Sequence, residues 1–343
     1  MTTFNEEVLE RRVRMGYIPT PLQQLSRLGQ EFKHSSLWIK RDDLTDVALG
    51  GNKVRKLEFH LCAALEAGAD TILTFGGPQT NHGRLTAAVA ALYGLKCILV
   101  LDGRDPGELS GNLILDNLLG ADVRFVKPSE RSERVEEIVR EYKASGHEVF
   151  IIPMGGSNAL GTLGYVVMMQ ELAEQIRTNK ISPTLLFVAV GSAGTLAGIV
   201  LGAKIFGFNN LKIHGIPVFP PGEMEITQLT LDYSREAAKL LGLNDIVISE
   251  DDFFVDYGPK EDPYSGLGYN IPDAKTYGAI RSFASREAIF LDPCYTGKAA
   301  RAYLQFVEQE ATADDTVLFV HTGGSPGLWA RVNMDYLNEH PQG

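Results

Sequence analysis

The sequence predicts an α/β protein of two domains, each an open, mostly parallel sheet with helices on both faces. Three observations support this prediction. Apolar β-prone runs alternate with amphipathic helical runs, glycine-rich turns follow the strands, and 343 residues exceed what one core usually supports. The predicted strands are residues 36–40, 71–75, 97–101, 123–126, 149–152, 185–190, 213–218, 289–291 and 317–320. The predicted helices are the run behind Asn52 and residues 85–92, 113–119, 133–143, 163–176, 196–205, 228–241, 275–284 and 328–337.

The first half of the chain begins with an extended lead-in at Pro19 and Pro21, because proline restricts the residue before it to extended geometry. Helical spacing of apolar residues then follows Asn52, a residue type that commonly caps helix N-termini. The later units each pair a β-prone run with an apolar helical face, and several of these faces end at a glycine, as at Gly94.

The second half of the chain contains a fully apolar strand, 185–190, and a small-residue helix behind it. Residues 249–272 are the least regular and the richest in acids and aromatics, which predicts a functional loop region. No linker separates the two sets of units. We therefore expect an inserted domain: residues 57–179 form a smaller domain within a larger one made of 1–56 and 180–343, with a ligand cleft between them.

Composition excludes several classes of protein. There are 32 Lys and Arg against 43 Asp and Glu, giving a net charge of −11, and no basic stripe that nucleic acid would require. The N-terminal residues are acidic and lack a signal-peptide core, and no apolar run approaches membrane-spanning length. Cys62, Cys97 and Cys294 are far apart and lack metal-ligand spacing, so we predict buried thiols in a reducing compartment and no metal site. We expect a cytoplasmic protein.

A cluster of cations follows Gly50 and Gly51, whose lack of a side chain permits unusual φ and close approach to a ligand. Lys53, Arg55 and Lys56 fall in the first turn of the predicted helix, where the helix dipole is already positive. An anion such as phosphate would resolve this conflict. A lysine held beside other cations also has a lowered pKa, which makes it a nucleophile toward carbonyls. The alternative is three solvated surface cations after a flexible turn.

A phosphate-binding turn is predicted between strand 185–190 and its helix, at Gly191, Ser192, Ala193, Gly194 and Thr195. Small residues allow backbone N–H groups to converge on phosphate oxygens, and the two hydroxyls add donors. The segment lacks the Gly-Lys-Ser/Thr of a P-loop and the full glycine pattern of a dinucleotide fold. A simple tight turn between strand and helix is the alternative.

Another polar turn, residues 76–83, places Gln79, Thr80, Asn81 and His82 at one strand's carboxyl end, where ligands commonly bind in such sheets. Glycine-rich turns recur at 154–158 and 321–326, which indicates one cofactor cleft contacted from several loops. As alternatives, Thr80 or Asn81 could cap the helix and His82 could be an ordinary surface histidine.

Two tyrosines, Tyr269 and Tyr295, are flanked by turn formers or begin a helix. A phenol near cations can have a lowered pKa and act as acid or base. The alternative is that both are packing residues with a solvated hydroxyl.

Taken together, these motifs resemble the fold-type-II pyridoxal-phosphate enzymes grouped as 1-aminocyclopropane-1-carboxylate deaminase and D-cysteine desulfhydrase. The matches run in the family's order from residues 19–21 to 321–324 and cover essentially the whole chain. The resemblance implies fold type II, pyridoxal 5′-phosphate as cofactor, a small amino acid as substrate, and a homodimer.

The resemblance also implies roles for the cofactor-binding residues. Lys53 would hold the cofactor as an internal Schiff base and, once displaced by substrate, act as the base at Cα. Lys56 and residues 191–195 would bind the phosphate. Asn81 would bond the cofactor's 3′-oxygen, and Thr322 would face the pyridine nitrogen.

On the substrate side, the resemblance implies that Thr80, Asn81 and His82 contact the amino acid and that Thr80 meets its carboxylate or the reacting atoms. The family usually has serine where this chain has Thr80. Tyr269 and Tyr295 would flank the substrate.

Departures from the family pattern bear on the reaction. Family deaminases typically carry glutamate where this chain has Thr296. They also tend to carry glutamine at the position of His82, whereas the desulfhydrases have histidine there, as this chain does. A neutral hydroxyl leaves the cofactor ring a weaker electron sink. This favours β-elimination over opening of a cyclopropane.

The function we expect is therefore cleavage of D-cysteine to pyruvate, ammonia and sulfide. An L-cysteate sulfo-lyase and then the cyclopropane deaminase are alternatives, and the enantiomer stays open. A non-catalytic protein binding a nucleotide or phosphate ligand is a further alternative. It is disfavoured because no acidic residue follows residues 191–195 at dinucleotide-fold spacing.

Overall fold

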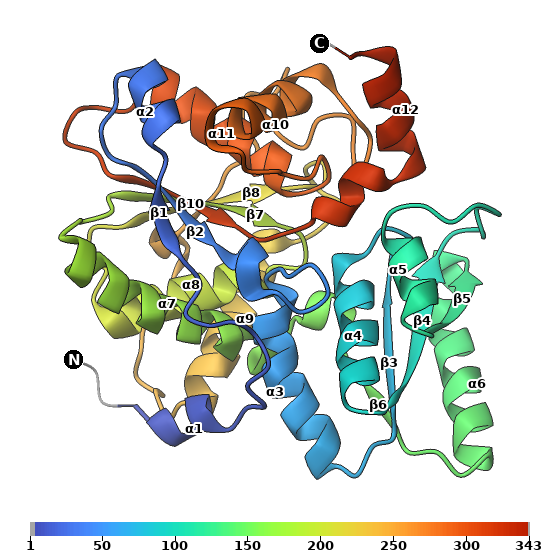
Figure 1. The fold of residues 1–343 in the computed structure, drawn as a ribbon. Coiled ribbons are helices and arrows are strands. Elements are labelled where there is room, and N and C mark those ends of the chain that lie inside the picture. Colours follow the sequence, from blue (N-terminus) through green and yellow to red (C-terminus); the bar gives the residue numbers. More distant parts are fainter. Residues whose placement is uncertain (1–3, 342–343) are drawn as a thin grey trace.

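The computed structural model describes residues 4–341, which form two α/β units, each built on its own sheet (Figure 1). The helices are α1 Glu6–Glu10, α2 Ser26–Phe32, α3 Lys53–Glu66, α4 Asn81–Leu92, α5 Asn112–Leu118, α6 Arg131–Ala144, α7 Ala159–Asn179, α8 Gly194–Phe206, α9 Ile226–Leu240, α10 Ala274–Glu287, α11 Thr296–Gln309 and α12 Arg331–Glu339. The strands are β1 Leu22–Gln24, β2 Leu37–Arg41, β3 Thr71–Gly76, β4 Lys96–Asp102, β5 Asp122–Val126, β6 Val149–Ile151, β7 Leu185–Val190, β8 Lys212–Pro217, β9 Phe254–Val255 and β10 Val317–His321.

The larger unit is a six-stranded sheet in the order β1-β2-β10-β7-β8-β9, parallel except for the β1–β2 pair. Side chains of β7 alternate between its two faces. Leu186 and Val188 pack with α7, α8 and α9, whereas Leu185 and Phe187 pack with α10 and α11. Figure 1 shows these two groups of helices on opposite faces of the sheet. Apolar residues on both faces explain the uninterrupted apolar run of β7.

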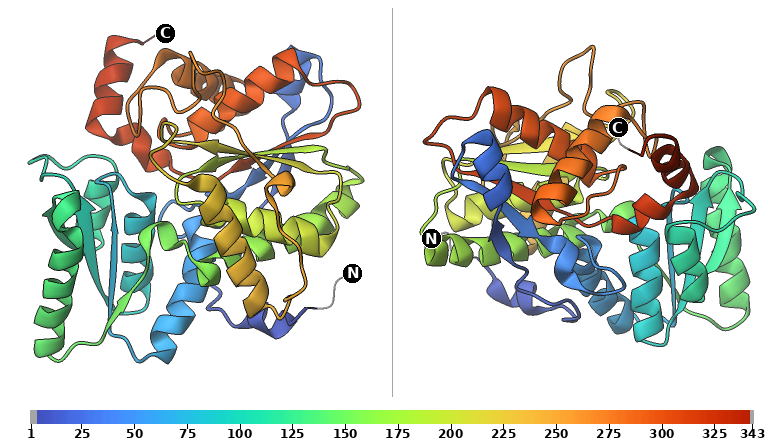
Figure 2. Two further views of the ribbon diagram at one scale, coloured as in Figure 1. Left: turned by 180° about the vertical axis from the view of Figure 1, so that it is seen from behind. Right: turned by 45° about the horizontal axis from the view of Figure 1, so that its top comes forward.

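The smaller unit is a four-stranded parallel sheet in the order β5-β4-β3-β6. Helices α4 and α5 pack on one face and α6 on the other. Helix α3 packs against both α4 and α7, so it connects the two units, which lie beside each other in Figure 2. All four strands of this sheet lie between residues 57 and 179, and the boundaries of the inserted domain stay a prediction.

The predicted fold class is confirmed, and most predicted elements match the structure to within a few residues. The strand expected at 289–291 is wrong: these residues are an irregular link between α10 and α11, in which Ile289 and Leu291 pack in the core and Phe290 is exposed, and none of them joins a sheet. The helix expected at 328–337 is divided. A 3₁₀ turn, Ser325–Trp329, precedes α12, and extended backbone at Ala330 separates the two. Strand β9 is only two residues long and left no recognisable pattern in the sequence.

Two of the three cysteines, Cys97 and Cys294, are buried as expected, but Cys62 is partly exposed. Cys62 lies on α3 beside Glu66, on a face of the helix that does not pack in the core. Across residues 4–341, the helices are too short or too polar to cross a bilayer.

Candidate active site

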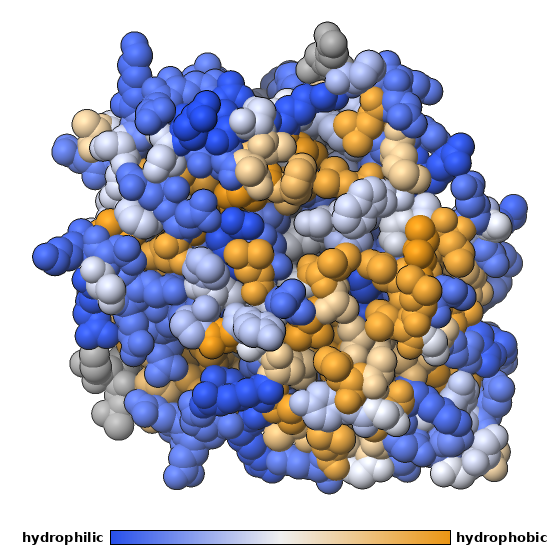
Figure 3. Space-filling model, viewed as in Figure 1, coloured by the Kyte–Doolittle hydropathy of each residue, from blue (hydrophilic) through white to orange (hydrophobic). Residues whose placement is uncertain are grey.

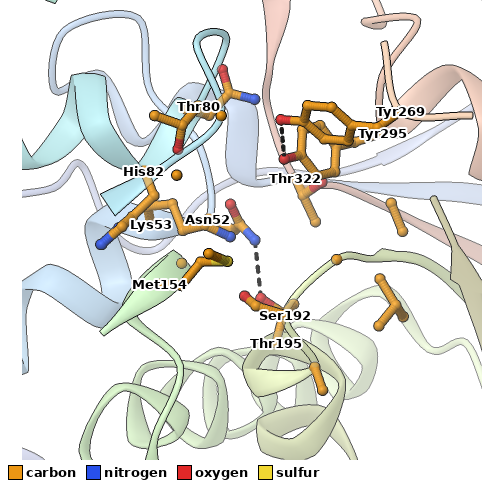
Figure 4. A pocket seen from close by; sticks show the side chains of 18 of the residues that line it. Asn52, Lys53, Thr80, His82, Met154, Ser192, Thr195, Tyr269, Tyr295 and Thr322 are labelled. Carbon is orange, nitrogen blue, oxygen red and sulfur yellow. Dashed lines mark hydrogen bonds between the residues drawn. The ribbon is translucent and has the colours of Figure 1, made fainter. Parts of the chain in front are cut away.

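A cavity of about 260 Å³ opens between the two units. Its walls include the carboxyl ends of three parallel strands, at Gly76 after β3, Gly191 after β7 and Thr322 after β10. This is the edge at which ligands of parallel α/β sheets bind. Figure 4 shows side chains from both units converging on this space.

The cavity brings together the predicted site residues, although they come from six separate segments of the chain. The predicted residues that line it are Lys53, Lys56, Thr80, Asn81, His82, Gly191, Ser192, Ala193, Thr195, Tyr269, Tyr295 and Thr322. Gly194 does not line it. A side chain at Gly194 would come within 2.9 Å of Lys56 Nζ and 2.7 Å of Ser157 Oγ, so this glycine permits close packing behind the turn. The roles assigned to these residues stay predictions.

Lys53 is the first residue of α3, and a strained turn precedes it. Ala48, Leu49 and Gly50 all have left-handed φ values, of 43°, 68° and 62°. A side chain at Gly50 would collide with the Asp43 carbonyl at 2.1 Å, so glycine is required there. Arg84 of α4 donates to the carbonyls of Ala48 and Gly50, which holds this turn against the smaller unit.

The Lys53 amine is prepared for nucleophilic chemistry. Burial lowers the pKa of Lys53 to about 8, and burial is its sole cause. The side chain keeps partial exposure to the cavity, so the amine is surrounded by protein yet reachable by a ligand. A lowered amine pKa is what a lysine that attacks carbonyls needs.

Asn52 does not cap α3, contrary to expectation. Its backbone is already helical, with φ −55° and ψ −23°, so its side chain points away from the first-turn N–H groups. Its amide nitrogen instead donates to Thr195 Oγ1 at 2.9 Å, and its backbone N–H donates to the Thr322 carbonyl at 3.0 Å. Asn52 therefore ties the start of α3 to two other cavity walls.

Lys56 is fully buried and lacks a carboxylate partner among residues 4–341. Its Nζ donates to Ser157 Oγ at 2.9 Å and to the Gly155 carbonyl at 3.2 Å. Burial, followed by the charge of Lys53, holds the pKa of Lys56 well below its usual value. A bound anion would stabilise the charged form of Lys56, so this end of the cavity is suited to an anion.

The turn after β7 supplies backbone donors at the same end. Ala193 is in the left-handed region, with φ 60°, and α8 begins directly behind it. Within the described part of the chain, the backbone N–H groups of Ser192, Ala193, Thr195 and Leu196 have no acceptor. Unpaired N–H groups at a helix N-terminus form a phosphate-sized anion site.

Arg55 does not join Lys53 and Lys56 at this anion site. Its guanidinium points into the larger unit, where it donates twice to Asp42, both at 2.8 Å, and twice to Glu171, at 3.0 and 3.3 Å. Helical spacing places Arg55 on a different side of α3 from the other two cations. The expected cluster of three cations is therefore a pair, and Arg55 is part of a buried ion-pair network.

The polar turn after β3 is partly structural. Thr80 caps α4, because its Oγ1 accepts the Gly83 N–H at 3.2 Å. Asn81 Oδ1 accepts a hydrogen bond from Asn112 at 3.0 Å. His82 is buried and not a surface histidine; its Nε2 lies 3.0 Å from Thr74 Oγ1. Burial, with a contribution from Lys53, lowers the pKa of His82 well below its usual value, so the ring is neutral.

The two tyrosines form a pair across the cavity from Lys53 (Figure 4). Their hydroxyls are 2.7 Å apart, and Phe219 stacks on Tyr269 with ring centroids 5.2 Å apart. Burial raises the pKa of both phenols well above its usual value. The expected lowering of a phenol pKa is therefore wrong, because burial disfavours the charged form of both phenols.

Thr296 does not line the cavity. Its hydroxyl donates to Asp292 Oδ1 at 2.7 Å and accepts the Asp292 backbone N–H at 2.9 Å, which closes the loop at the start of α11. Of the two threonines considered for the ring nitrogen, Thr322 is the one at the cavity wall.

Sequence reasoning missed three functional positions. Asn52 was assigned to capping, and Phe219 follows β8 with no glycine or polar motif to mark it. Ser157, whose Oγ lies 2.7 Å from Ser192 Oγ, belongs to a glycine-rich turn that had already been singled out. Residues 4–341 contain no group of three His, Cys, Asp or Glu side chains placed to hold a metal ion.

Comparison with known proteins is consistent with this site. Residues 13–323 match the family model described as pyridoxal-phosphate dependent enzyme. A Thermotoga maritima protein with the provisional name 1-aminocyclopropane-1-carboxylate deaminase is 38% identical over 93% of this chain and 98% of its own. A Yersinia pestis D-cysteine desulfhydrase is 37% identical over 91% and 93%. A crystal structure of an ACC deaminase homologue superposes with a TM-score of 0.84 at 36% identity, covering 99% of both chains.

These matches span nearly the full length of the relatives. Because the matched family consists of enzymes, the non-catalytic alternative is excluded. The chain belongs to the pyridoxal-phosphate dependent enzymes of fold type II, in the group that contains ACC deaminase and D-cysteine desulfhydrase.

Proposed function

We propose that this enzyme catalyses β-elimination from D-cysteine, releasing pyruvate, ammonia and sulfide. The observation that carries the proposal is the placement of Lys53, with its lowered pKa, between an anion site and a pair of neutral phenols. The desulfhydrase name of relatives at 37% identity supports the choice of substrate.

The cavity suits pyridoxal phosphate. Four unpaired N–H groups at residues 192–196 and the uncompensated charge of Lys56 match a phosphate group, and Lys53 supplies an amine for the aldehyde. When bound, the cofactor supplies an electron sink for the negative charge left at Cα after deprotonation. Thr322 and Asn81 contact the ring in this proposal.

The chain's own residues handle the protons. Lys53 Nζ would hold the cofactor and, when free, would take the proton from Cα of the amino acid. The Tyr269 and Tyr295 hydroxyls face the substrate as neutral donors and can protonate the departing sulfur. Thr80, Asn81 and His82 orient the carboxylate from the start of α4.

A specific observation favours elimination over cyclopropane opening. Among the described residues that line the cavity, the one carboxylate is Asp102, which pairs with Arg131 at 2.7 Å. Thr322 is thus a neutral partner for the ring nitrogen, so the electron sink is weaker than one with a carboxylate partner. Opening a cyclopropane that lacks an α-hydrogen requires the stronger sink. The 38% identical relative named as an ACC deaminase keeps that reaction as the second candidate.

The test is keto-acid release from D-cysteine, L-cysteine, L-cysteate, D-serine, β-chloro-alanines and 1-aminocyclopropane-1-carboxylate. We expect pyruvate and sulfide from D-cysteine. Release of 2-oxobutyrate from the cyclopropane with none from D-cysteine would refute the proposal, and pyruvate from L-cysteate alone would identify a sulfo-lyase.

Two lysine variants check the role of Lys53. Lys53→Ala should lose the visible cofactor absorption band that borohydride removes from the parent enzyme. Lys204→Ala should keep it, because Lys204 pairs with Asp252 far along α8.

We also propose that the enzyme is a cytoplasmic homodimer. Figure 3 shows apolar side chains gathered over α4 and α5, where Leu92 and Leu118 are 64% and 76% exposed. A second copy of the chain would cover such a face. Leu118→Lys should halve the mass measured by light scattering. A parent protein that is monomeric at micromolar concentration would contradict the dimer, and recovery outside the cytosolic fraction would contradict the location.

A further inference from the structure

Lys298 is a second fully buried lysine near the cavity, and no role has been assigned to it so far. It lies in the first turn of α11, three residues after Tyr295. Its Nζ donates to two main-chain carbonyls, at 2.7 Å to Gly268 and at 3.0 Å to Val218. Within residues 4–341 it has no carboxylate at ion-pair distance. Because both hydrogen-bond acceptors of this ammonium are main-chain carbonyls of separate segments, its contacts fit a positional role.

Both carbonyls directly precede aromatic residues of the cavity wall. Gly268 is followed by Tyr269, and Val218 is followed by Phe219. These two rings stack on each other with an interplanar angle of 11°, and Tyr269 reaches Tyr295 through its hydroxyl. One ammonium therefore holds the backbone beneath both stacked rings.

The Tyr269 segment has few other restraints. Residues 256–273 contain no helix or strand, and Gly266, Gly268 and Asn270 all have positive φ. Arg301 of α11 donates to the Asp262 and Pro263 carbonyls at 3.2 Å, which fixes the middle of the segment. Closer to Tyr269, the link beyond the internal turns is the hydrogen bond that the Asn270 side chain accepts from Asn333. Without the Lys298 bonds, the backbone at Gly268 would have no link to the sheet or to α11 among the described contacts.

We propose that Lys298 is a positioning residue for substrate recognition: it fixes Phe219 and Tyr269 as one rigid wall of the amino-acid site and sets the Tyr269–Tyr295 contact. The cofactor's anion site uses the backbone N–H groups of residues 192–196 and the Lys56 amine, neither of which contacts Lys298, and does not depend on it. Lys298 should thus control affinity for the amino acid and leave affinity for the cofactor unchanged.

The experiment compares Lys298→Met, Lys298→Gln and the control Lys204→Met with the parent holoenzyme. Hydrogen exchange measured by mass spectrometry should be at least tenfold faster in peptides covering residues 264–272 of Lys298→Met, and unchanged outside these peptides and those that contain Val218 and Phe219. D-alanine and L-alanine, which cannot undergo elimination, serve as binding probes through the visible cofactor spectrum. Their dissociation constants should rise at least tenfold in Lys298→Met and less in Lys298→Gln, whose amide can still donate to one carbonyl.

Cofactor affinity, measured by equilibrium dialysis, should stay within twofold of the parent in all three variants. A cycle with Phe219→Leu adds a check: if Lys298 acts through the ring pair, the double variant should bind alanine no more weakly than the weaker single variant.

Unchanged exchange at 264–272, faster exchange throughout the chain, or equal loss of cofactor and amino-acid affinity would each overturn the proposal. None of these measurements requires that D-cysteine be the substrate. If the proposed function is wrong, they still decide whether Lys298 positions the aromatic wall. If Lys298→Met does not fold, Lys298→Gln supplies the same comparison.

Discussion

In the protein without cofactor, Lys53 should react with acetic anhydride at pH values at which exposed lysines are almost fully protonated. Only the neutral amine attacks the reagent, so the reaction rate follows the neutral fraction. Burial lowers the pKa of Lys53 to about 8 from the usual 10.5, because no carboxylate stabilises its charged form. At pH 7 the neutral fraction is then about 9%, against about 0.03% for an ordinary lysine, roughly a 300-fold difference.

Competitive labelling measures this directly. The apoprotein is treated with trace isotopic acetic anhydride between pH 6 and 11, and each lysine peptide is quantified by mass spectrometry after complete chemical acetylation. The labelling of Lys53 should rise with a midpoint near pH 8, while exposed lysines such as Lys143 serve as internal references. Adding the cofactor should protect Lys53. A midpoint for Lys53 close to the usual lysine value would refute the burial argument and with it the assignment of Lys53 as a prepared nucleophile.

Two further predictions concern the groups that hold the site in place. Arg55→Met should lower the free energy of unfolding by about 3–5 kcal/mol at pH 7, measured in urea, because it leaves the Asp42 carboxylate buried and unpaired. Arg124→Met, which removes a partly exposed pair, should cost at most about 1 kcal/mol. Burial would raise the pKa of Asp42, but Arg55 outweighs it and lowers the pKa from 3.8 to about 2. The stabilisation is therefore complete above about pH 3.8 and is lost as the pH falls through 2, and a constant difference between parent and Arg55→Met down to pH 1.5 would contradict it. Asn52→Ala removes the 2.9 Å hydrogen bond to Thr195, which contributes about 1 kcal/mol. The cofactor's dissociation constant, measured by equilibrium dialysis, should therefore rise roughly fivefold. Asn179→Ala, at the exposed end of α7, is the control, and equal effects of the two variants would contradict the role of Asn52.

Local pattern was sufficient for the predicted fold class and for most helices and strands. The apolar run of β7 and the helical spacing behind Lys53 can be recognised from the residue types and from the spacing of apolar residues within a short stretch of sequence. The failures are short or irregular pieces. The two residues of β9 are too few for a pattern. The apolar residues at 289–291 form an irregular link with two of its three side chains buried, which apolar character alone does not distinguish from a strand.

The set of candidate site residues could also be predicted, because glycine-rich turns and polar side chains at strand ends mark the ligand edge of a parallel sheet. The residues that each of these side chains contacts in the folded protein could not be predicted from the sequence. Arg55 was expected to join Lys53 and Lys56, yet it pairs with Asp42 and with Glu171, and the second of these lies more than a hundred residues away in sequence. The raised pKa of Tyr269 likewise depends on its burial and on Cys294 and Tyr295, which lie more than twenty residues away in sequence.

By itself the sequence determined the two-sheet α/β organisation, the turn that precedes Lys53, and the polar residue types at each strand end. Tertiary structure decided which cations face the anion site, that His82 and the two tyrosines are neutral, and that Lys298 lies beneath the aromatic wall. The physical reason is that periodicity and turn chemistry are local, whereas desolvation and ion pairing depend on which distant segments the folded chain places within a few ångströms of each group.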